Sequence, residues 1–281
     1  MAARITGVGE MRVALFAGCI HDFFFPRSAM AVVRILEHLG VTVEFPEGQT
    51  CCGQAHFNSG YRDEARRLAR HFVEVFDGGQ GGPPSYIVSP SGSCTAMVRE
   101  FYPAMFVGHG LLAGRARAVA SRVVEFTDFL VSVLGQVDLG ARFPARAVYH
   151  ASCHTTRLLH VVEPPLALLR AVEGLELVEY EGAELCCGFG GTFAVKSPEL
   201  SAAMADAKLD AITAAGAELV ISADASCLLH LMGRASKRRL PLRFMHVAEL
   251  LAEGMGLMEP ALPQAERAQP QALREEGRAV G

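Results

Sequence analysis

A doubled cysteine motif constrains this chain more than any other feature. The tripeptide Cys-Cys-Gly occurs twice, at residues 51–53 and 186–188. Neighbouring side chains on an extended segment point to opposite sides, so a packed core has no simple use for two consecutive cysteines. A loop that curls around a metal centre can direct both thiols to one target. We therefore predict a metal-binding loop at each of the two positions.

The two tripeptides belong to a longer internal repeat. Each of the four cysteines in the first half of the chain recurs 133 to 135 residues later. Surrounding segments recur with them, as SPSGSC at 89–94 and SADASC at 222–227 show. Self-similarity at a fixed offset indicates a duplication. We call the two sets the first quartet, Cys19, Cys51, Cys52 and Cys94, and the second quartet, Cys153, Cys186, Cys187 and Cys227.

The composition favours free thiols over disulfides. The chain has 281 residues, of which 51% are hydrophobic, which is enough to bury a core without covalent cross-links. Its start, MAARITGVGEMRV, lacks the long apolar stretch of a secretory signal, so we expect a cytoplasmic protein in a reducing compartment. No apolar run reaches ~18 residues, so we expect no transmembrane segment. The net charge of −4 argues against nucleic-acid binding, which usually needs a basic surface.

Alternating strand and helix signals predict the fold. Short apolar runs rich in β-branched residues indicate strands, and apolar residues at helical spacing indicate the helices between them. The alternation favours an α/β fold of two duplicated, Rossmann-like, three-layer halves with mostly parallel sheets. We assign residues 1–140 to the first cysteine-rich half, 141–258 to the second, and 259–281 to a mobile tail. The expected strands are 11–18, 41–46, 86–90, 146–150, 175–180, 218–222 and 242–247, and the expected helices are 26–40, 59–76, 164–173, 198–215 and 248–254.

The cysteines follow the predicted strands in both halves. Open α/β sheets place their sites at the carboxyl ends of the strands, so each quartet is expected to converge there from three loops. Four thiolates at one point suit an iron–sulfur cluster or a tetrahedral zinc ion. The spacing is neither the paired CxxC of a zinc ribbon nor the CxxCxxC run of a ferredoxin. The glycine-rich segment 188–193 lacks the GKS/T ending of a phosphate-binding loop.

Six segments together resemble a known family. They are FAGC (16–19), FPEGQTCCGQ (45–54), SPSGSC (89–94), HASCHTTR (150–157), CCGFGGTFAVK (186–196) and SADASCLLH (222–230). The chain resembles the lactate utilization protein A family over about residues 11–256. That family belongs to the cysteine-rich CCG-domain group, with the iron–sulfur subunit of glycolate oxidase and the cysteine-rich subunit of heterodisulfide reductase.

The resemblance implies a function and its partners. It implies one or two iron–sulfur clusters, of the 4Fe–4S type, held by the cysteines of the two quartets. It also implies an electron-transfer subunit of an oxidoreductase that converts L-lactate to pyruvate and is inactive alone. The implied partners are a ferredoxin-type iron–sulfur protein and a third subunit. We expect the chain in the cytoplasm, or at the membrane periphery through these partners.

One departure from the wider group bears on the chemistry. Its heterodisulfide-reductase members end each motif in CxxC, whereas this chain has Met97 and His230 at the last position. Four-ligand clusters that relay electrons are therefore favoured over five-cysteine clusters that cleave disulfides. A thiol–disulfide reductase subunit remains one alternative. A structural or assembly protein that holds zinc in one or both halves is another.

Three histidines lie beside the second quartet. His150 and His154 flank Cys153, and His230 follows Cys227. Each is a candidate to donate a hydrogen bond near the metal centre and tune it. The alternative for each is an ordinary histidine with a backbone partner. We find no GxGxxG fingerprint after the first strand, so no flavin site is expected in this chain.

Overall fold

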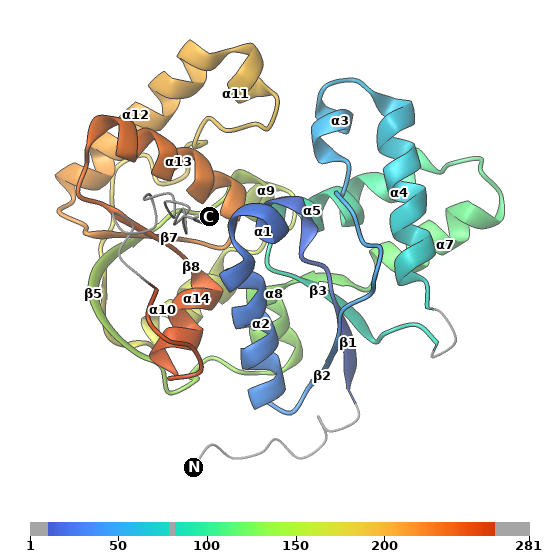
Figure 1. Ribbon diagram of the computed structural model, residues 1–281, viewed down its shortest axis with the longest axis horizontal. Helices are drawn as coiled ribbons and strands as arrows, with labels where there is room; N and C mark the ends of the chain where they lie inside the picture. The colour runs from blue at the N-terminus through green and yellow to red at the C-terminus, as the bar shows by residue number, and fades with distance from the viewer. Residues whose placement is uncertain (1–10, 79–81, 262–281) are drawn as a thin grey trace, which may run out of the picture.

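A computed structural model describes residues 11–78 and 82–261. It contains two four-stranded parallel sheets (Figure 1), with strand orders β2-β1-β3-β4 and β6-β5-β7-β8. The two orders are the same order repeated, so the prediction of a duplicated, Rossmann-like α/β fold is confirmed. The strands are β1 Arg12–Leu15, β2 Thr42–Glu44, β3 Tyr86–Ser89 and β4 Val123–Glu125, then β5 Arg142–Tyr149, β6 Glu173–Leu177, β7 Leu219–Ser222 and β8 Arg243–His246.

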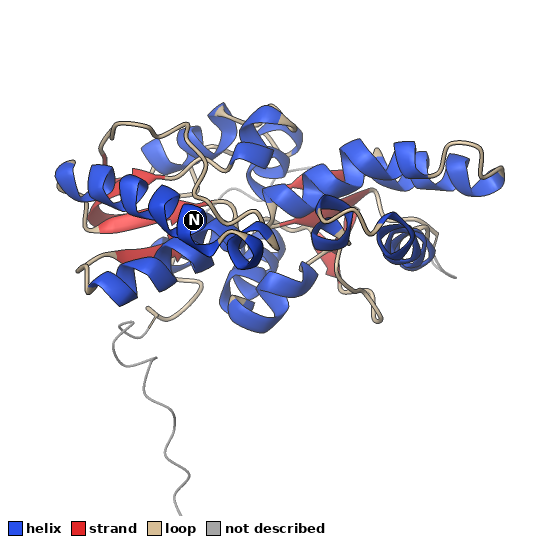
Figure 2. Cartoon of the chain, turned by 90° about the horizontal axis from the view of Figure 1, so that it is seen from above, coloured by secondary structure: helices blue, strands red, loops and turns tan. Residues whose placement is uncertain are grey.

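Helices connect the strands and cover both faces of each sheet (Figure 2). The first half contains α1 Gly18–Phe24, α2 Pro26–His38, α3 Gln54–Asn58, α4 Arg62–Phe76, α5 Gly92–Ala96, the π-helix η1 Met97–Phe101, α6 Tyr102–Met105, α7 Leu111–Ala120, α8 Phe126–Asp128 and the π-helix η2 Phe129–Val133. The second half contains α9 Cys153–Arg157, α10 Glu163–Arg170, α11 Phe193–Lys196, α12 Pro198–Ala214, α13 Ala225–Arg238 and α14 Val247–Gly254.

The strands divide their side chains between two layers of core. In β1, Val13 and Leu15 face a central hydrophobic cluster, while Ala14 faces an outer one. In β5, Ala147 joins the same central cluster and Val148 faces a separate outer cluster. This alternation is the period of two expected for strands buried on both faces. The central layer is therefore shared, and the two halves bury one continuous core between them.

The halves contact each other in matched pairs of helices. Helix α2 packs on α14, and its repeat counterpart α10 packs on α8 and η2. Likewise α1 contacts α13, and α9, the counterpart of α1, contacts α5, the counterpart of α13. Paired contacts of this kind are those of a two-fold interface between copies. Two of these helix pairs carry quartet cysteines, so the interface brings the two quartets to the same region of the molecule.

Buried hydrogen bonds join the halves near the cysteines. The backbone N–H of Ser93 donates to Oδ2 of Asp224 over 2.8 Å, and Nε2 of His246 lies 2.9 Å from the carbonyl oxygen of Pro90. The approach of α5 to α9 is so close that a Cβ at Gly92 would lie 1.8 Å from Oγ1 of Thr155. Only glycine fits there, because any side chain would overlap the opposite half.

The predicted elements are present with shifted bounds. The helix expected at 59–76 begins at Arg62, and the short helix α3 precedes it. The strand expected at 146–150 begins earlier, at Arg142, with a register shift before Ala145. The predicted tail lies outside the described residues from 262 onward, and the division at residue 140 stays a prediction. In the described ranges, no helix combines the length and the apolar character needed to cross a bilayer.

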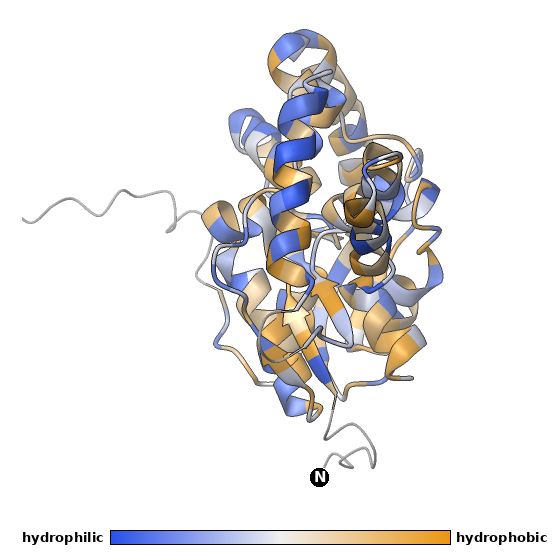
Figure 3. Cartoon of the chain, turned by 90° about the vertical axis from the view of Figure 1, so that its right-hand side faces the viewer, coloured by the Kyte–Doolittle hydropathy of each residue, from blue (hydrophilic) through white to orange (hydrophobic). Residues whose placement is uncertain are grey.

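Helix α4 shows why the outer layer forms. Its residues Ala65, Ala69, Phe72, Val73 and Phe76 are buried against the first sheet. Charged residues occupy the opposite face of α4. Figure 3 shows that the helices on this side of the molecule have hydrophilic and hydrophobic residues next to each other. A helix of this amphipathic pattern is stabilised chiefly by packing its apolar stripe on the sheet.

Glu125 is a buried carboxyl group at the end of β4. Its Oε2 accepts hydrogen bonds from the N–H groups of Thr127, at 2.8 Å, and Asp128, at 3.2 Å, and so caps α8. Burial raises the pKa of this carboxyl group from 4.5 to about 7, although the hydrogen bonds from Thr127 and Asp128 oppose the rise. The folded state therefore binds a proton at Glu125 more tightly than the unfolded chain does.

We predict that this proton makes stability depend on pH. Between about pH 4.5 and 7 the folded state holds more protons than the unfolded state, so this group's contribution to stability falls as pH rises. Glu125→Gln removes this titrating group. The free energy of unfolding of the variant, relative to that of wild type, should therefore increase by up to about 3 kcal/mol from pH 4.5 to pH 8. Denaturant titrations across this range measure the gap. The exposed Glu74→Gln is the control, and an equal gain in that variant would contradict the assignment.

Candidate metal centres

Each quartet is assembled from three loops at the carboxyl edge of its sheet. In the first half, Cys19 lies in α1 after β1, the adjacent pair precedes α3, and Cys94 lies in α5 after β3. In the second half, Cys153 begins α9, the adjacent pair lies between β6 and α11, and Cys227 lies in α13. The structure therefore brings together all four cysteines of each half, as the repeat predicted. All eight are free thiols.

The sulfur atoms of the first quartet form a connected chain. Sγ of Cys19 lies 3.6 Å from Sγ of Cys51. The thiol of Cys52 hydrogen-bonds on one side with Cys51 and on the other with Cys94. Cys52 is only 2% exposed and Cys94 9%, whereas Cys19 and Cys51 are half-buried. The quartet thus has a deep side and a side that reaches toward solvent.

The second quartet repeats this arrangement. Cys186 hydrogen-bonds with Cys153 and Cys187, and Cys187 in turn with Cys227. Cys187 and Cys227 are buried, and the other two are half-buried. The order of sulfur contacts matches the first quartet position by position. The matching order indicates that the same local fold positions the cysteines in both halves.

The glycine of each tripeptide directs a backbone amide at sulfur. The N–H of Gly53 lies 3.4 Å from Sγ of Cys51, and the N–H of Gly188 lies 3.4 Å from Sγ of Cys186. Both glycines have positive φ, of 81° and 90°, which side chains rarely adopt. At Gly188 a Cβ would also lie 2.7 Å from the carbonyl oxygen of Ser201. The loop geometry therefore requires glycine.

Because the four thiols of a quartet lie close together, some of them have lowered pKa values and others raised ones. Hydrogen bonds from Cys19 and Cys52 lower the pKa of Cys51 to about 2, and those from Cys153 and Cys187 do the same for Cys186. The thiols that donate these bonds have raised pKa values, because they lie against a thiolate and are buried.

The lowered and raised pKa values of the thiols bear on whether a metal group fits the quartets. Adding further negative charge to such a crowded site is unfavourable unless a cation shares it. A cationic metal core lets all four sulfurs ionise, so the donor set fits a four-thiolate centre.

The predicted histidines lie in three different settings. Nδ1 of His154 lies 3.7 Å from Sγ of Cys153. Nε2 of His230 lies 3.2 Å from Oγ of Ser201, which donates to the carbonyl oxygen of Gly188 over 2.7 Å, so His230 supports the loop rather than contacting sulfur. His150 is buried beside Cys187 and Cys227, and the three donor atoms lie within 4.8 Å of one another.

The positions of the missing fifth cysteines hold no thiol. Met97 is fully buried in the outer cluster of the first half, where η1 begins. His230 holds the corresponding place in the second half and is engaged by Ser201. Each quartet therefore offers four sulfur donors and no fifth.

Sequence reasoning missed Lys208. This lysine is 4% exposed and donates to the carbonyl oxygens of Gly182, at 2.9 Å, and Ala183, at 3.2 Å. Burial lowers its pKa, while the charge of the thiolates of the second quartet opposes the fall. The sequence signal was that Lys208 falls on the apolar face of the helix expected at 198–215, between Ala205 and Ile212, which pack in the core.

Asp224 was also missed. Its carboxylate begins α13 by accepting from the N–H of Ser226 over 3.1 Å, and it accepts from the opposite half through Ser93. The first half has Ser91 at the matching position, where its hydroxyl accepts from the N–H of Cys94. The sequence signal was the aspartate of SADASC at the position where SPSGSC has a serine.

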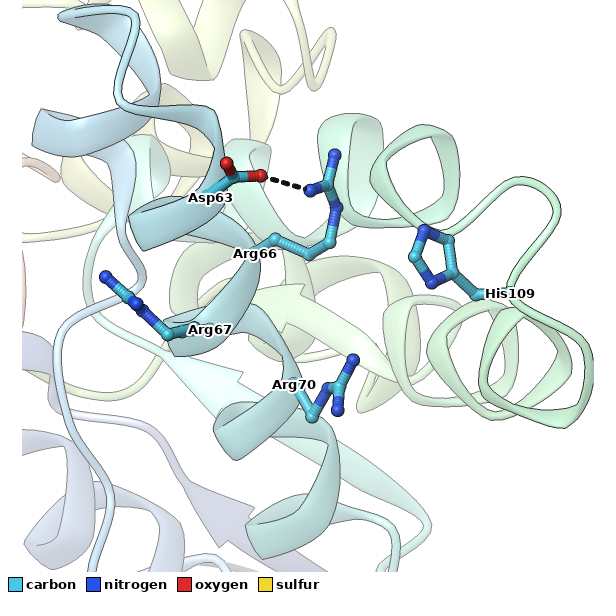
Figure 4. Close-up of a pocket in the computed structure, with 5 residues that line it drawn as sticks. All are labelled: Asp63, Arg66, Arg67, Arg70 and His109. Carbon is cyan, nitrogen blue, oxygen red and sulfur yellow. Dashed lines mark hydrogen bonds and ion pairs between the residues drawn. The ribbon is translucent and has the colours of Figure 1, made fainter.

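A basic hollow lies on the surface between α4 and the loop before α7, with a volume of about 360 Å³ (Figure 4). Arg66 donates to Oδ1 of Asp63 over 2.7 Å and to the carbonyl oxygen of Met105 over 3.2 Å. The hollow carries net positive charge, because arginines outnumber the acidic residues that line it. The lining residues are Asp63, Arg66, Arg67, Arg70 and His109, and none belongs to a quartet.

Comparisons with known proteins agree with this arrangement. The pattern of the family described as CCG, cysteine-rich domain, matches residues 13–99 and 147–232, one match to each half. "Lactate utilization protein A" of Exiguobacterium sp. is 49% identical over 243 residues, which cover 86% of this chain and 98% of that protein. The protein of the same name from Geobacillus sp. is 45% identical over 241 residues, covering 86% and 99%. The chain belongs to the lactate utilization protein A family.

A solved structure adds a likeness of fold. A hypothetical protein from Helicobacter pylori superposes with a TM-score of 0.62 at 8% identity. The match covers 89% of this chain, which spans 50% of that protein. At this identity the likeness concerns the fold alone. For this member of the lactate utilization protein A family, the quartets therefore carry the functional argument.

We predict that Gly188→Ala disrupts the second centre. The added Cβ meets the backbone of Ser201 in a conformation already strained for alanine, so the loop must move and the amide leaves Cys186. Metal bound per chain, measured by plasma mass spectrometry, should fall while the first centre keeps its share. Gly191→Ala is the matched control, because Gly191 also has positive φ, of 61°, but no atom within 4 Å of the added Cβ. Equal loss in both variants would contradict the prediction.

Proposed function

We propose that the chain is an iron–sulfur electron-transfer subunit of a system that oxidises L-lactate to pyruvate. It binds one cluster at each quartet, of the 4Fe–4S type, and acts together with partner proteins. The observation that carries the proposal is the convergence of two matched sets of four thiols, each at the carboxyl edge of its own sheet. The name shared by the relatives supplies the metabolic context.

Several features of the quartets support a cluster. Backbone N–H groups of Gly53 and Gly188 point at cysteine sulfur, and hydrogen bonds of this kind stabilise the negative charge of an iron–sulfur core. The buried ammonium group of Lys208 adds a compensating charge at the second quartet. When bound, a cluster supplies one-electron redox chemistry, and the chain's own residues hold it, exclude water on the deep side and set its electrostatic surroundings.

The relation between the quartets supports a relay. Helix α5, which carries Cys94, contacts α9, which carries Cys153. Helix α1, which carries Cys19, contacts α13, which carries Cys227. Each quartet also has two half-buried cysteines on its outer side, where an electron can enter or leave. Two centres on contacting helices suit transfer between two partner proteins.

The partners we propose are a ferredoxin-type iron–sulfur protein and a third subunit, with the complex in the cytoplasm or at the membrane periphery. The chain alone then lacks lactate-oxidising activity. Thiol–disulfide reductase chemistry is disfavoured, because buried Met97 and the engaged His230 leave each quartet without a fifth thiol. Zinc remains the competing occupant, and the first experiment distinguishes it.

We expect anaerobically purified protein to contain iron and acid-labile sulfide in equal amounts. Cys51→Ser with Cys52→Ser should remove the share of the first centre, and Cys186→Ser with Cys187→Ser that of the second. The EPR spectrum of the reduced protein should lose one component in each variant. Met97→Leu, a buried change at a non-ligand beside Cys94, should keep both. Stoichiometric zinc without sulfide would contradict the proposal and favour a structural role.

We predict that Lys208→Met lowers the reduction potential of the second centre only. The ammonium group stabilises the extra negative charge of the reduced cluster, so its loss makes reduction less favourable. An EPR-monitored redox titration measures both potentials. Lys208→Arg should retain most of the wild-type value, and Lys196→Met, which removes an exposed charge from α11, should shift it little. An equal shift at both centres would show that the lysine acts on the fold rather than on the second centre.

A further inference from the structure

His150 is buried in an unusual state. It directly follows β5, is 1% exposed, and neither of its ring nitrogens has a nitrogen or oxygen partner among the described residues. The other buried histidines of the interface are better satisfied. Nε2 of His246 meets the carbonyl oxygen of Pro90 and its Nδ1 accepts from Ala248, while Nδ1 of His21 bonds to Ser28. The polar neighbour of the His150 ring is sulfur instead, since it hydrogen-bonds with the thiol of Cys227. A buried imidazole whose polar contact is with a cysteine of the quartet is placed to serve that quartet.

The ring of His150 lies on the deep side of the second quartet. One of its nitrogens and the sulfurs of Cys187 and Cys227 lie within 4.8 Å of one another, and all three side chains are buried. Donor atoms around one bound metal lie about 3–4 Å apart, given bonds of about 2.0–2.3 Å. The three groups therefore lie close enough together to be donors to the same metal group.

The internal repeat provides a natural control for this position. The offset that relates Cys153 to Cys19 relates His150 to Phe16. Phe16 is fully buried, and its ring meets those of Phe72, at 4.8 Å between centroids, and Phe76, at 5.7 Å. The fold therefore fills this site with an apolar ring where no nitrogen is required. A histidine in its place is not explained by packing.

We propose that His150 is a nitrogen ligand of the second metal centre. The inference rests on the proposed function in that it takes the second quartet to hold a metal group. Neutral imidazole suits both iron and zinc, whereas a thiolate at this depth would add more negative charge. The first centre then has four cysteine donors, whereas at the second the imidazole occupies one of the four ligand positions in place of a thiolate. The two halves share a fold but hold chemically different centres.

Pulsed EPR on the reduced, full-length protein tests the ligand. Wild type should show a strongly coupled nitrogen at the second centre, and His150→Phe, which installs the residue of the first half, should lose it. His154→Phe is the matched control, because His154 lies beside Cys153 on the half-buried side, and it should retain the coupling. The signal of the first centre reports whether His150→Phe remains folded.

If that variant does not fold, His150→Gly with added imidazole replaces it. Nitrogen-15-labelled imidazole should restore the coupling with the label's frequency. Wild type without a strongly coupled nitrogen, or coupling that survives in His150→Phe, overturns the proposal. A shifted potential without nitrogen coupling also overturns it, since a hydrogen-bond donor would act in that way. If the sample contains zinc and no sulfide, the proposed function fails, and X-ray absorption at the zinc edge then reads the same zinc–nitrogen bond separately.

Discussion

Four thiols held against one another at the edge of a sheet are the constraint on which the rest of this structure depends. Hydrogen bonds to the thiolates of Cys51 and Cys186, together with burial and repulsion, raise the pKa of the neighbouring thiols, so the four do not all ionise without a cation. A cationic core resolves the conflict. The loops therefore bring the sulfur atoms together. The glycine after each cysteine pair has a positive φ, which directs its backbone N–H at the sulfur of the first cysteine.

The duplicated scaffold explains how such loops are held. Each quartet draws on three segments distant in sequence, which only a prefolded parallel sheet aligns. The halves then merge their inner layers into one core and contact each other through matched helix pairs. Close approach at Gly92 and the bond from Ser93 to Asp224 lie next to the cysteines. The interface that stabilises the fold is thus also the place where the two centres meet.

The two halves of the duplicated fold differ in the residues that surround their quartets. The second half has His150 where the first has Phe16, and it buries Lys208 against its quartet. A positive charge and a neutral nitrogen both favour the reduced state of a metal centre relative to an all-thiolate site. Under the proposed function, these residues would make the second centre the better electron acceptor of the two.

Much of this was readable from the sequence. The repeat of cysteines and the alternation of strand and helix signals predicted the duplicated α/β halves and both quartets, because each depends on local pattern and fixed spacing. Contacts across the chain were not readable in this way. The pairing of α5 with α9, the position of the buried His150 ring beside Cys187 and Cys227, and the burial of Lys208 depend on packing between distant segments. The sequence by itself determined which sulfurs belong together, and only the tertiary structure decided that the two sites differ in their surroundings, since burial and contacts between distant residues exist only in the folded chain.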